Sequence, residues 1–454
     1  MTIYLWKNKK IQQLTSDNKY FISSLFSSLT PIEKNLPLLY NDKKGGIKMK
    51  KAISLILSIL ILATCFTTMV YAKEDNTLQF NEDGKFTILN ISDIQDGYPL
   101  NPLAKDYIEK TVDMVKPDLI VLTGDNVSGF DIPEEEDAEK AIREYMDIFQ
   151  ERDIKVAAVF GNHDDEETES TKEHQLSVYE SYDCYVGQAG FCIKDRVGTY
   201  NLPIMKSDGN SYGFNLWLTD SGTYNTENDF GGYACVYKEQ IEWYKETATK
   251  LKEENGGEAI PSINFQHIIV PEIYDALQQT KILWFGRIIR KKNPLNDTTK
   301  FYKLPDGAIG ELREYPCPPY YNNGQYDAML EMGDVLATVS GHDHENSFEI
   351  DYKGIKIINT PTVGFNAYND KNVGSRVFVI DENDPENFET YCLTISDVYG
   401  KIDKLYEARI LYNIDTTGWF TKLCSLIRIA RADDMSFMDF MRGVYHIFKN
   451  IQLF

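Results

Sequence analysis

Positive charge and histidine are both scarce in this sequence. The 454 residues include 47 Lys and Arg against 69 Asp and Glu, a formal charge of −22, and only six histidines. Nucleic acid and anionic membrane surfaces repel so acidic a chain, so we expect neither as a partner. The seven cysteines contain no Cys-x-x-Cys pair, and no internal repeat or low-complexity linker appears between residues 76 and 400. The 43% hydrophobic and 26% charged content is ordinary for a globular protein.

The segment 49–72 has the organisation of a targeting sequence. It begins with basic residues at 49–51, continues with an apolar run and ends in small residues before Lys73. This order is typical of a secretory signal peptide cleaved after Ala72, which predicts a secreted or cell-envelope protein. The alternative is an uncleaved membrane anchor formed by residues 52–72, because the run approaches the ~20 residues that span a bilayer.

Residues 1–48 precede the basic region of that signal, although signal peptides normally start there. The segment Lys44-Gly45-Gly46 can be encoded by a purine-rich string of the ribosome-binding type, a few bases ahead of Met49. We therefore interpret residues 1–48 as an over-extended start.

Export would permit disulfide bonds. Cys65 falls in the signal segment, and among the six other cysteines Cys184 and Cys192 are the nearest pair and the best candidates for a disulfide. Isolated buried thiols are the alternative, since spacing alone does not determine connectivity.

Short apolar runs alternate with segments of helical period. We expect strands at 85–92, 118–123, 155–160, 213–219, 262–266 and 334–340, and helices at 104–116, 134–150 and 238–254. This alternation predicts a layered α/β core. From residue 347 onward strand follows strand, which predicts an antiparallel extension.

Five of these strands are followed by polar residues that commonly bind metals. They are Asp93, Gly124-Asp125-Asn126, Gly161-Asn162-His163-Asp164, His267 and Gly341-His342-Asp343-His344. Binding crevices in open α/β sheets form at the carboxyl ends of the strands, so these loops are expected to converge. Four of the six histidines lie here, whereas His174 and His446 are interpreted as surface or packed residues. The pattern predicts a metal site.

In this order the motifs SDIQ, GDN, GNHD, QH and GHDH resemble the calcineurin-like metallophosphoesterase superfamily, which includes the purple acid phosphatases. Its pattern is D-x-H, GD, GNH-D/E, H and GHxH. The likeness runs from about Lys85 to Val363, and the segments LWLTDSGTYN and EQIEWYKETATKL are similar to a bacterial branch of purple-acid-phosphatase-like members. The resemblance implies a four-layer sandwich over residues 73–400, with two mixed β-sheets flanked by helices and the metal site at the carboxyl ends of the strands.

The same resemblance implies two divalent or trivalent metal ions. Asp125 would bridge them, one ion taking Asp93, Asp125, His344 and the position of Gln95, the other taking Asp125, Asn162, His267 and His342. Mixed nitrogen and oxygen ligands suit Mn, Fe or Zn. His163 would stabilise developing charge or protonate the leaving oxygen, with Asp164 as its orienting partner.

Gln95 departs from the family pattern, which has histidine at this place. An amide oxygen is a poorer ligand than imidazole for these metals. Asp96 could restore a charged ligand, or Gln95 could only bind a metal-coordinated water. We expect two metals to remain, with the one near Asp93 bound more weakly.

These residues predict an exported phosphoesterase that hydrolyses a small phosphorylated compound through a metal-activated hydroxide. The alternative is a catalytically weak or silent metal- or phosphate-binding protein of the same fold, for which Gln95 is the support. The expected partner is a small-molecule phosphoester, either a monoester or a diester. A membrane is an expected partner only if the signal segment stays uncleaved.

Two further regions carry predictions. Residues 281–325 look like a loop insertion rich in proline, tyrosine and basic residues. Its Arg287, Arg290, Lys291 and Lys292 could contact a substrate phosphate, with a solvated basic turn as the alternative. The tail, 401–454, has helical spacing of Met, Phe and Tyr and is expected to pack as a helix on the core, or else to associate with a surface or membrane.

Overall fold

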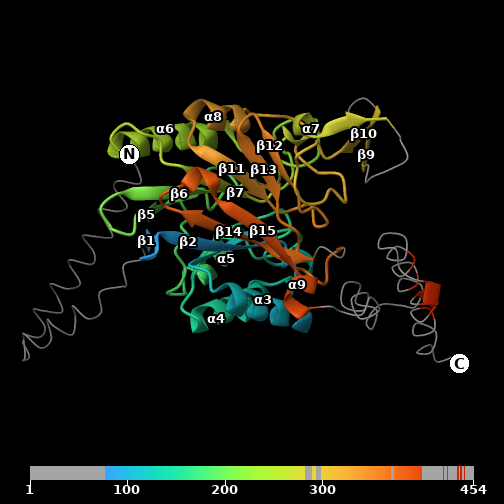
Figure 1. Ribbon diagram of the computed structural model, residues 1–454. Coiled ribbons are helices and arrows are strands. Elements are labelled where there is room, and N and C mark those ends of the chain that lie inside the picture. The colour runs from blue at the N-terminus through green and yellow to red at the C-terminus, as the bar shows by residue number, and fades with distance from the viewer. Residues whose placement is uncertain are drawn as a thin grey trace, which may run out of the picture. The chain divides into compact units, whose positions relative to one another are not determined.

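Two β-sheets pack face to face, and helices cover the outer face of each (Figure 1). The computed structural model describes residues 77–281, 289–292, 298–369 and 373–400, with isolated positions between 423 and 444. Both large sheets mix parallel and antiparallel pairs. The four-layer α/β class predicted from the sequence is therefore confirmed.

The proposed start, the signal segment and nearly all of the C-terminal tail lie outside the described residues. Their assignments, and the domain bounds 73–400, stay predictions. The described elements run from Leu78 to Tyr399. Among the helices described, none has the length and hydropathy needed to cross a bilayer.

The five-stranded sheet carries the first three motifs. Its order is β15-β14-β2-β3-β4, in which β2, β3 and β4 are parallel and β14 is antiparallel to both of its neighbours. The parallel strands therefore end at one edge. The bounds are Lys85–Ile91 for β2, Leu119–Thr123 for β3, Lys155–Val159 for β4, Gly374–Asp381 for β14 and Glu389–Thr394 for β15.

The seven-stranded sheet carries the last two motifs. Its order is β1-β5-β6-β7-β11-β13-β12, with β6, β7, β11 and β13 parallel. The bounds are Leu78–Gln79 for β1, Tyr200–Met205 for β5, Tyr212–Thr219 for β6, Ser262–Gln266 for β7, Val335–Ser340 for β11, Glu349–Tyr352 for β12 and Ile355–Asn359 for β13.

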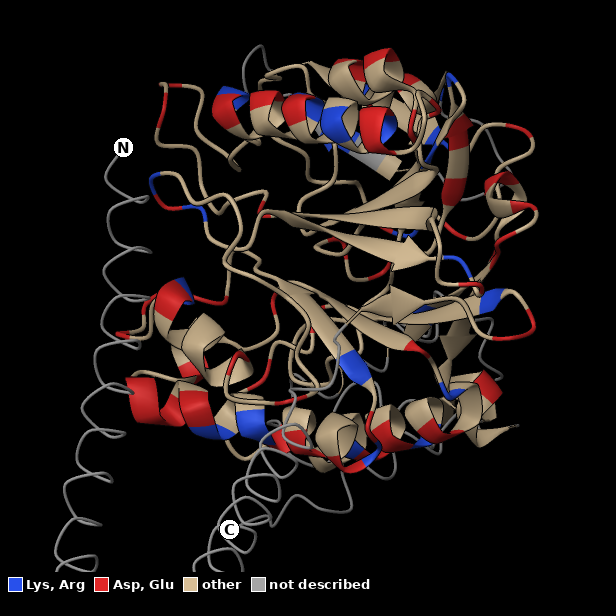
Figure 2. Cartoon of the chain, turned by 90° about the vertical axis from the view of Figure 1, so that its left-hand side faces the viewer, with Lys and Arg blue, Asp and Glu red and all other residues tan. Residues whose placement is uncertain are grey.

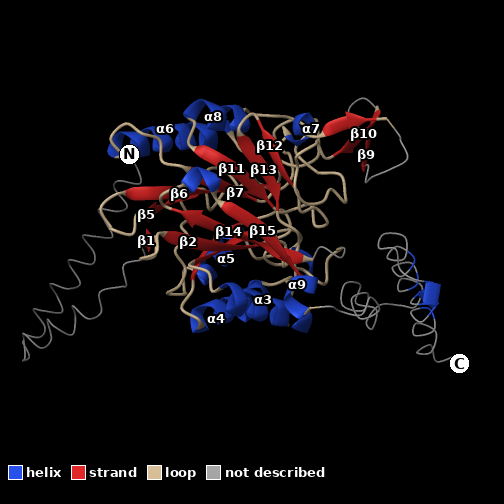
Figure 3. Ribbon diagram, viewed as in Figure 1, coloured by secondary structure: helices blue, strands red, loops and turns tan. Residues whose placement is uncertain are grey.

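Helices α3, α4 and α5 lie on the outer side of the five-stranded sheet, and α6 and α8 on that of the seven-stranded sheet (Figure 3). Their bounds are Pro102–Val115, Glu135–Glu151, Lys172–Tyr179, Lys238–Glu254 and Gln325–Met332. Short helices occupy Gly129–Asp131 (η2), Ile273–Ala276 (α7), Pro385–Asn387 (η3) and Ile395–Tyr399 (α9), and a small antiparallel sheet is formed by β8 (Gln278–Thr280), β10 (Thr299–Lys303) and β9 (Ile289–Lys292).

The layers explain why the central strands read as unbroken apolar runs. Along β3, Ile120 and Leu122 belong to the core beneath α3 and α4, whereas Leu119 and Val121 belong to the core between the two sheets. A strand that is buried on both faces needs apolar residues at every position. Charged residues lie instead mainly on the outer helices and the loops (Figure 2).

The antiparallel extension expected after residue 347 is only partly correct. Strands β12 and β13 form one antiparallel pair, and β14 and β15 form another. The two pairs join different sheets, because β13 pairs with β11 and β14 pairs with β2. The chain thus crosses between the sheets after β13, and its return to the first sheet was not readable from the strand pattern.

Candidate metal centre

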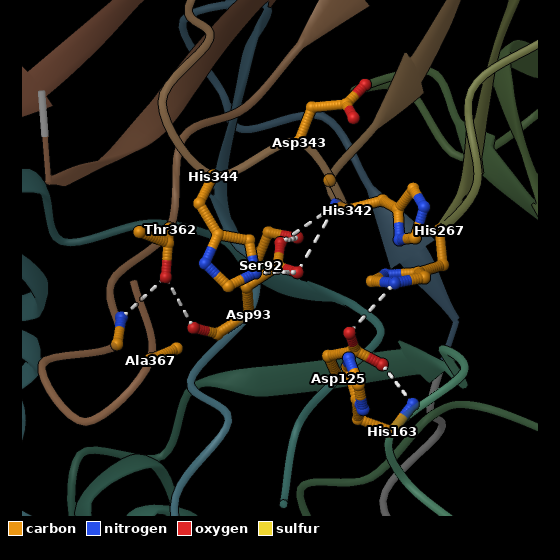
Figure 4. A network of polar contacts seen from close by, with 12 residues as sticks. Ser92, Asp93, Asp125, His163, His267, His342, Asp343, His344, Thr362 and Ala367 are labelled. Atoms are coloured by element: carbon orange, nitrogen blue, oxygen red, sulfur yellow. Dashed lines mark hydrogen bonds and ion pairs between the residues drawn. The ribbon is translucent and has the colours of Figure 1, made fainter. Parts of the chain in front are cut away.

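The five motif loops converge from both sheets (Figure 4). Asp93, Asp125 and the Asn162-His163 turn follow β2, β3 and β4, while His267 follows β7 and the GHDH loop follows β11. The site therefore lies where the carboxyl ends of strands from both sheets meet, rather than at a crevice in a single sheet.

Glycines in two of the motifs allow the loops to approach the carboxylates. A Cβ on Gly161 would lie 2.2 Å from Asp125 Oδ1, and one on Gly341 would lie 2.4 Å from Asp93 Oδ2. Asp93 and Asp125 themselves have φ of 53° and 47°, in the left-handed region. Such backbone strain is concentrated at functional sites.

Asp125, His267 and His342 form a buried group, with one potential ligand atom from each within 4.8 Å of the others. His267 Nε2 lies 3.0 Å from Asp125 Oδ2 and 3.2 Å from Asn162 Oδ1. Its Nδ1 lies 2.9 Å from the carbonyl oxygen of Thr123, where a neutral imidazole must place its N–H. The lone pair of Nε2 then faces two oxygens, an arrangement that a cation stabilises.

Buried atoms without partners mark the same place. Among the described residues, His342 Nε2 and the Asn162 amide nitrogen have no hydrogen-bond partner. Leaving a buried polar atom unpaired costs about 1–3 kcal/mol. Burial disfavours the charged imidazolium and lowers the pKa of His342 to about 3. A neutral imidazole with a free nitrogen is the form that binds metals, so these residues fit a metal ion.

Asp93 and His344 repeat this arrangement on the other side of the site. His344 Nδ1 lies 2.7 Å from the carbonyl oxygen of Tyr368, and Nε2 lies 3.4 Å from Asp93 Oδ1. The Asp93 carboxylate also accepts the backbone N–H of His342 at 3.1 Å. Asp343, between the two histidines, points away from them (Figure 4) and accepts the backbone N–H of Cys317 at 3.0 Å.

In the described part of the chain, Gln95 keeps an unpaired side-chain oxygen, whereas the Asp96 carboxylate is occupied by hydrogen bonds. The Gln95 side-chain oxygen is buried and has no hydrogen-bond partner among the described residues. The Asp96 carboxylate accepts the backbone N–H groups of Gly97 at 2.9 Å and Asn101 at 2.6 Å and also contacts the Asn366 amide. These contacts disfavour Asp96 as a replacement ligand.

We expect Gln95→His to tighten metal binding by about tenfold, at the lower end of the effect of changes around a metal's ligands, because imidazole binds these metals better than an amide. Gln95→Ala should weaken binding only modestly. Asp96→Asn is the control and should lower stability without changing affinity. Calorimetric titration of metal-free protein with Mn²⁺ and Zn²⁺ measures this, and equal affinity of Gln95→His, Gln95→Ala and the native protein would exclude Gln95 as a ligand.

His163 is held by a residue that the sequence reasoning missed. Its Nδ1 lies 2.5 Å from Glu166 Oε2, and its backbone N–H donates to Asp125 Oδ1 at 2.7 Å. The other Glu166 oxygen accepts the hydroxyl of Tyr224 at 3.0 Å. An acidic residue three positions after the histidine of a tight turn was the available signal.

Asp164 has a different role from the one predicted. Its carboxylate accepts the backbone N–H groups of Gly161 at 2.6 Å, Asn126 at 2.8 Å and Val127 at 3.1 Å. It thus ties the loops after β3 and β4 together. The prediction that Asp164 orients His163 is corrected, because Glu166 makes that contact.

The surrounding predictions are also revised. Lys291 places its amine 4.7 Å from the ring centre of Tyr315 and 5.5 Å from that of Tyr274, so it packs on one tyrosine inside the insertion and on another before it. Arg287 lies outside the described residues, as do the side chains of Arg290 and Lys292. All five cysteines in the described part of the chain are free, so the Cys184–Cys192 disulfide is absent there. Cys184 and Cys235 are isolated buried thiols, as the alternative expected, whereas Cys192 is exposed.

Comparison with known proteins agrees with this geometry. Residues 86–346 match the calcineurin-like phosphoesterase family, and since this is more than half of the chain, the protein belongs to that family. It is 28% identical over 369 residues to the "Probable inactive purple acid phosphatase 14" of Arabidopsis thaliana, covering 72% of this chain and 84% of that one. It is 26% identical over 300 residues to the "Phosphatase DCR2" of Saccharomyces cerevisiae, covering 60% and 46%.

Among solved structures, a dimetal phosphatase from Danio rerio is 14% identical, with a TM-score of 0.40, and the match covers 68% of this chain and 98% of that one. The plant relative carries the name of a purple acid phosphatase, so the chain is similar in sequence to that group. A bacterial branch stays a prediction.

Proposed function

We propose that this chain is an exported, metal-dependent phosphoester hydrolase acting on a small phosphorylated compound. The observation that carries the proposal is the matched orientation of His267 and His344. Each sets Nδ1 against a backbone carbonyl and turns Nε2 toward an aspartate. Export rests on residues 49–72, and sequencing the N-terminus of protein recovered outside the cell tests it.

The proposed chemistry divides between the metals and the chain. Two bound metals supply a nucleophile near neutral pH and neutralise charge on the phosphoryl group. Asp93 and His344 would hold one metal, with Gln95 as a weak third ligand, while Asn162, His267 and His342 would hold the other and Asp125 would bridge them. His163, whose backbone N–H donates to Asp125, would donate a side-chain proton to the leaving oxygen.

A catalytically weak or silent binding protein is the second candidate. It is favoured by Gln95 at the usual histidine position and by the printed names of relatives such as "Probable inactive purple acid phosphatase 14". Against it stands the contact of His163 with Glu166, because a protein that only binds phosphate has no need to hold an imidazole in one orientation.

Metal removal separates the two candidates. We expect protein starting at Lys73 to lose hydrolysis of a phosphoester panel after chelation and to recover it with Mn, Fe or Zn supplied singly, because the ligand set contains both nitrogen and oxygen. Phosphate release is the measurement, and Mg²⁺ is the comparison ion. Metal binding without phosphate release from any member of the panel would instead identify the binding protein.

A further inference from the structure

Two exposed aromatic side chains flank His163. Phe130, in η2, is 53% exposed, and its ring centre lies 6.2 Å from that of His163. Tyr224 is 41% exposed and reaches the same imidazole through Glu166. Single exposed apolar residues are common on proteins, but grouped around a polar site they indicate ligand contact.

Tyr224 is fixed in place although it is exposed. The segment 223–234 folds back on itself, with hydrogen bonds from Asn225 N–H to the Gly232 carbonyl at 2.8 Å and from Ala234 N–H to the Thr223 carbonyl at 3.0 Å.

Within this hairpin the Tyr224 ring stacks on Tyr233, with 5.6 Å between centroids and 21° between planes. Tyr233 in turn packs edge-on against His342 at 4.3 Å. The hairpin is thus tied to a predicted metal ligand through one ring and to Glu166 through a hydroxyl. A ring held on two sides loses little freedom on binding, which favours stacking with a ligand.

We propose that Phe130 and Tyr224 form a subsite for a planar aromatic ring in the leaving group of the substrate, such as a nucleoside or an aryl alcohol. This rests on the proposed function. In hydrolysis, water adds its oxygen to phosphorus, the phosphorus–oxygen bond to the leaving group breaks, and His163 protonates the released oxygen. The leaving group therefore lies beside His163, close to the exposed rings of Phe130 and Tyr224, and its ring can stack on them.

Adenosine 5′-monophosphate and ribose 5-phosphate are a matched pair for the test. Both release the primary 5′ oxygen of ribose, so the leaving oxygen is held constant and only the base differs. We expect kcat/KM for the nucleotide to exceed that for the sugar phosphate by about tenfold or more, as one stacked base contributes.

Variants of Tyr224 and Phe130 test whether the preference for the nucleotide depends on the two rings. Tyr224→Phe and Tyr224→Leu both remove the hydroxyl that contacts Glu166, and only the second removes the ring. The ratio of the two kcat/KM values should persist in Tyr224→Phe and fall toward one in Tyr224→Leu and in Phe130→Leu. Tyr391→Leu, at a tyrosine 46% exposed on β15, is the control and should leave the ratio unchanged.

The outcomes of this test distinguish failure of the subsite from failure of the proposed function. A ratio near one in the native protein, or an unchanged ratio in both leucine variants, overturns the subsite while leaving hydrolysis established. If neither compound is hydrolysed, phosphate release from the phosphoester panel decides the proposed function separately. The affinity ratio of the same two compounds, measured by calorimetry with Mn²⁺ present, then decides the subsite by the same criterion.

Discussion

Asp125→Asn is expected to abolish hydrolysis and to lower the metal content of the purified protein. Asp125 is fully buried, and its two oxygens face different parts of the site, Oδ1 toward the His163 N–H and Oδ2 toward His267 Nε2. Asparagine keeps the shape and one acceptor but removes the negative charge that a bridge between cations requires. The variant should lose several kcal/mol of transition-state stabilisation, which lowers the rate of hydrolysis by about 10³-fold or more.

Metal content by atomic emission and phosphate release measure this result together. Asp220→Asn is the matched control, because Asp220 is also fully buried and binds Val197 N–H at 2.9 Å and Gly222 N–H at 2.8 Å outside the predicted ligand set. It should lower thermal stability and leave the metal content of the folded protein intact. Near-normal turnover in Asp125→Asn would refute the two-metal assignment.

The sequence predicted the central elements well because their burial leaves few alternatives. The segments 238–254 and 262–266, read as a helix and a strand, are the observed α6 and β7. Strands buried on both faces and helices with one buried face give strong periodic signals. The loops at the strand ends were then expected to meet, and Figure 4 shows that they do.

What the sequence could not supply are contacts made by loops with no period of their own. Glu166 reaches His163 only because the turn after β4 folds back, and Asp164 is drawn instead to backbone N–H groups of two loops. The stacking of Tyr224 on Tyr233 depends on the hairpin they share. Loop conformation of this kind is set by tertiary contacts rather than by local pattern.

Removing Asp164 and removing Glu166 should have different effects, one on stability and the other on catalysis. Asp164 accepts three backbone N–H groups while buried, so removing its carboxylate leaves donors unpaired and should destabilise the fold. Glu166 contacts side chains at the site, the imidazole of His163 and the hydroxyl of Tyr224. Its loss should therefore affect catalysis more than folding.

His163→Ala is expected to lower turnover by about 10²–10⁴-fold, the range for a lost general acid or charge stabiliser, while metal content stays intact. The imidazole is turned toward Glu166 by the 2.5 Å contact at Nδ1, so its other nitrogen is left to act on the substrate. A substrate with a nitrophenolate leaving group needs no proton, and the loss should shrink for it. Turnover of nitrophenyl and alkyl phosphates, with metal analysis of each preparation, measures this.

Glu166→Gln tests the positioning role of the carboxylate. It should give the same dependence on the leaving group as His163→Ala but a smaller loss, because an amide of the same size keeps the close contact with the imidazole and only the negative charge is removed. Asp164→Asn is the control and should lower stability without that dependence.

A fall in metal content together with rate in His163→Ala would make His163 a ligand, since a proton donor that touches no metal can be deleted without releasing one.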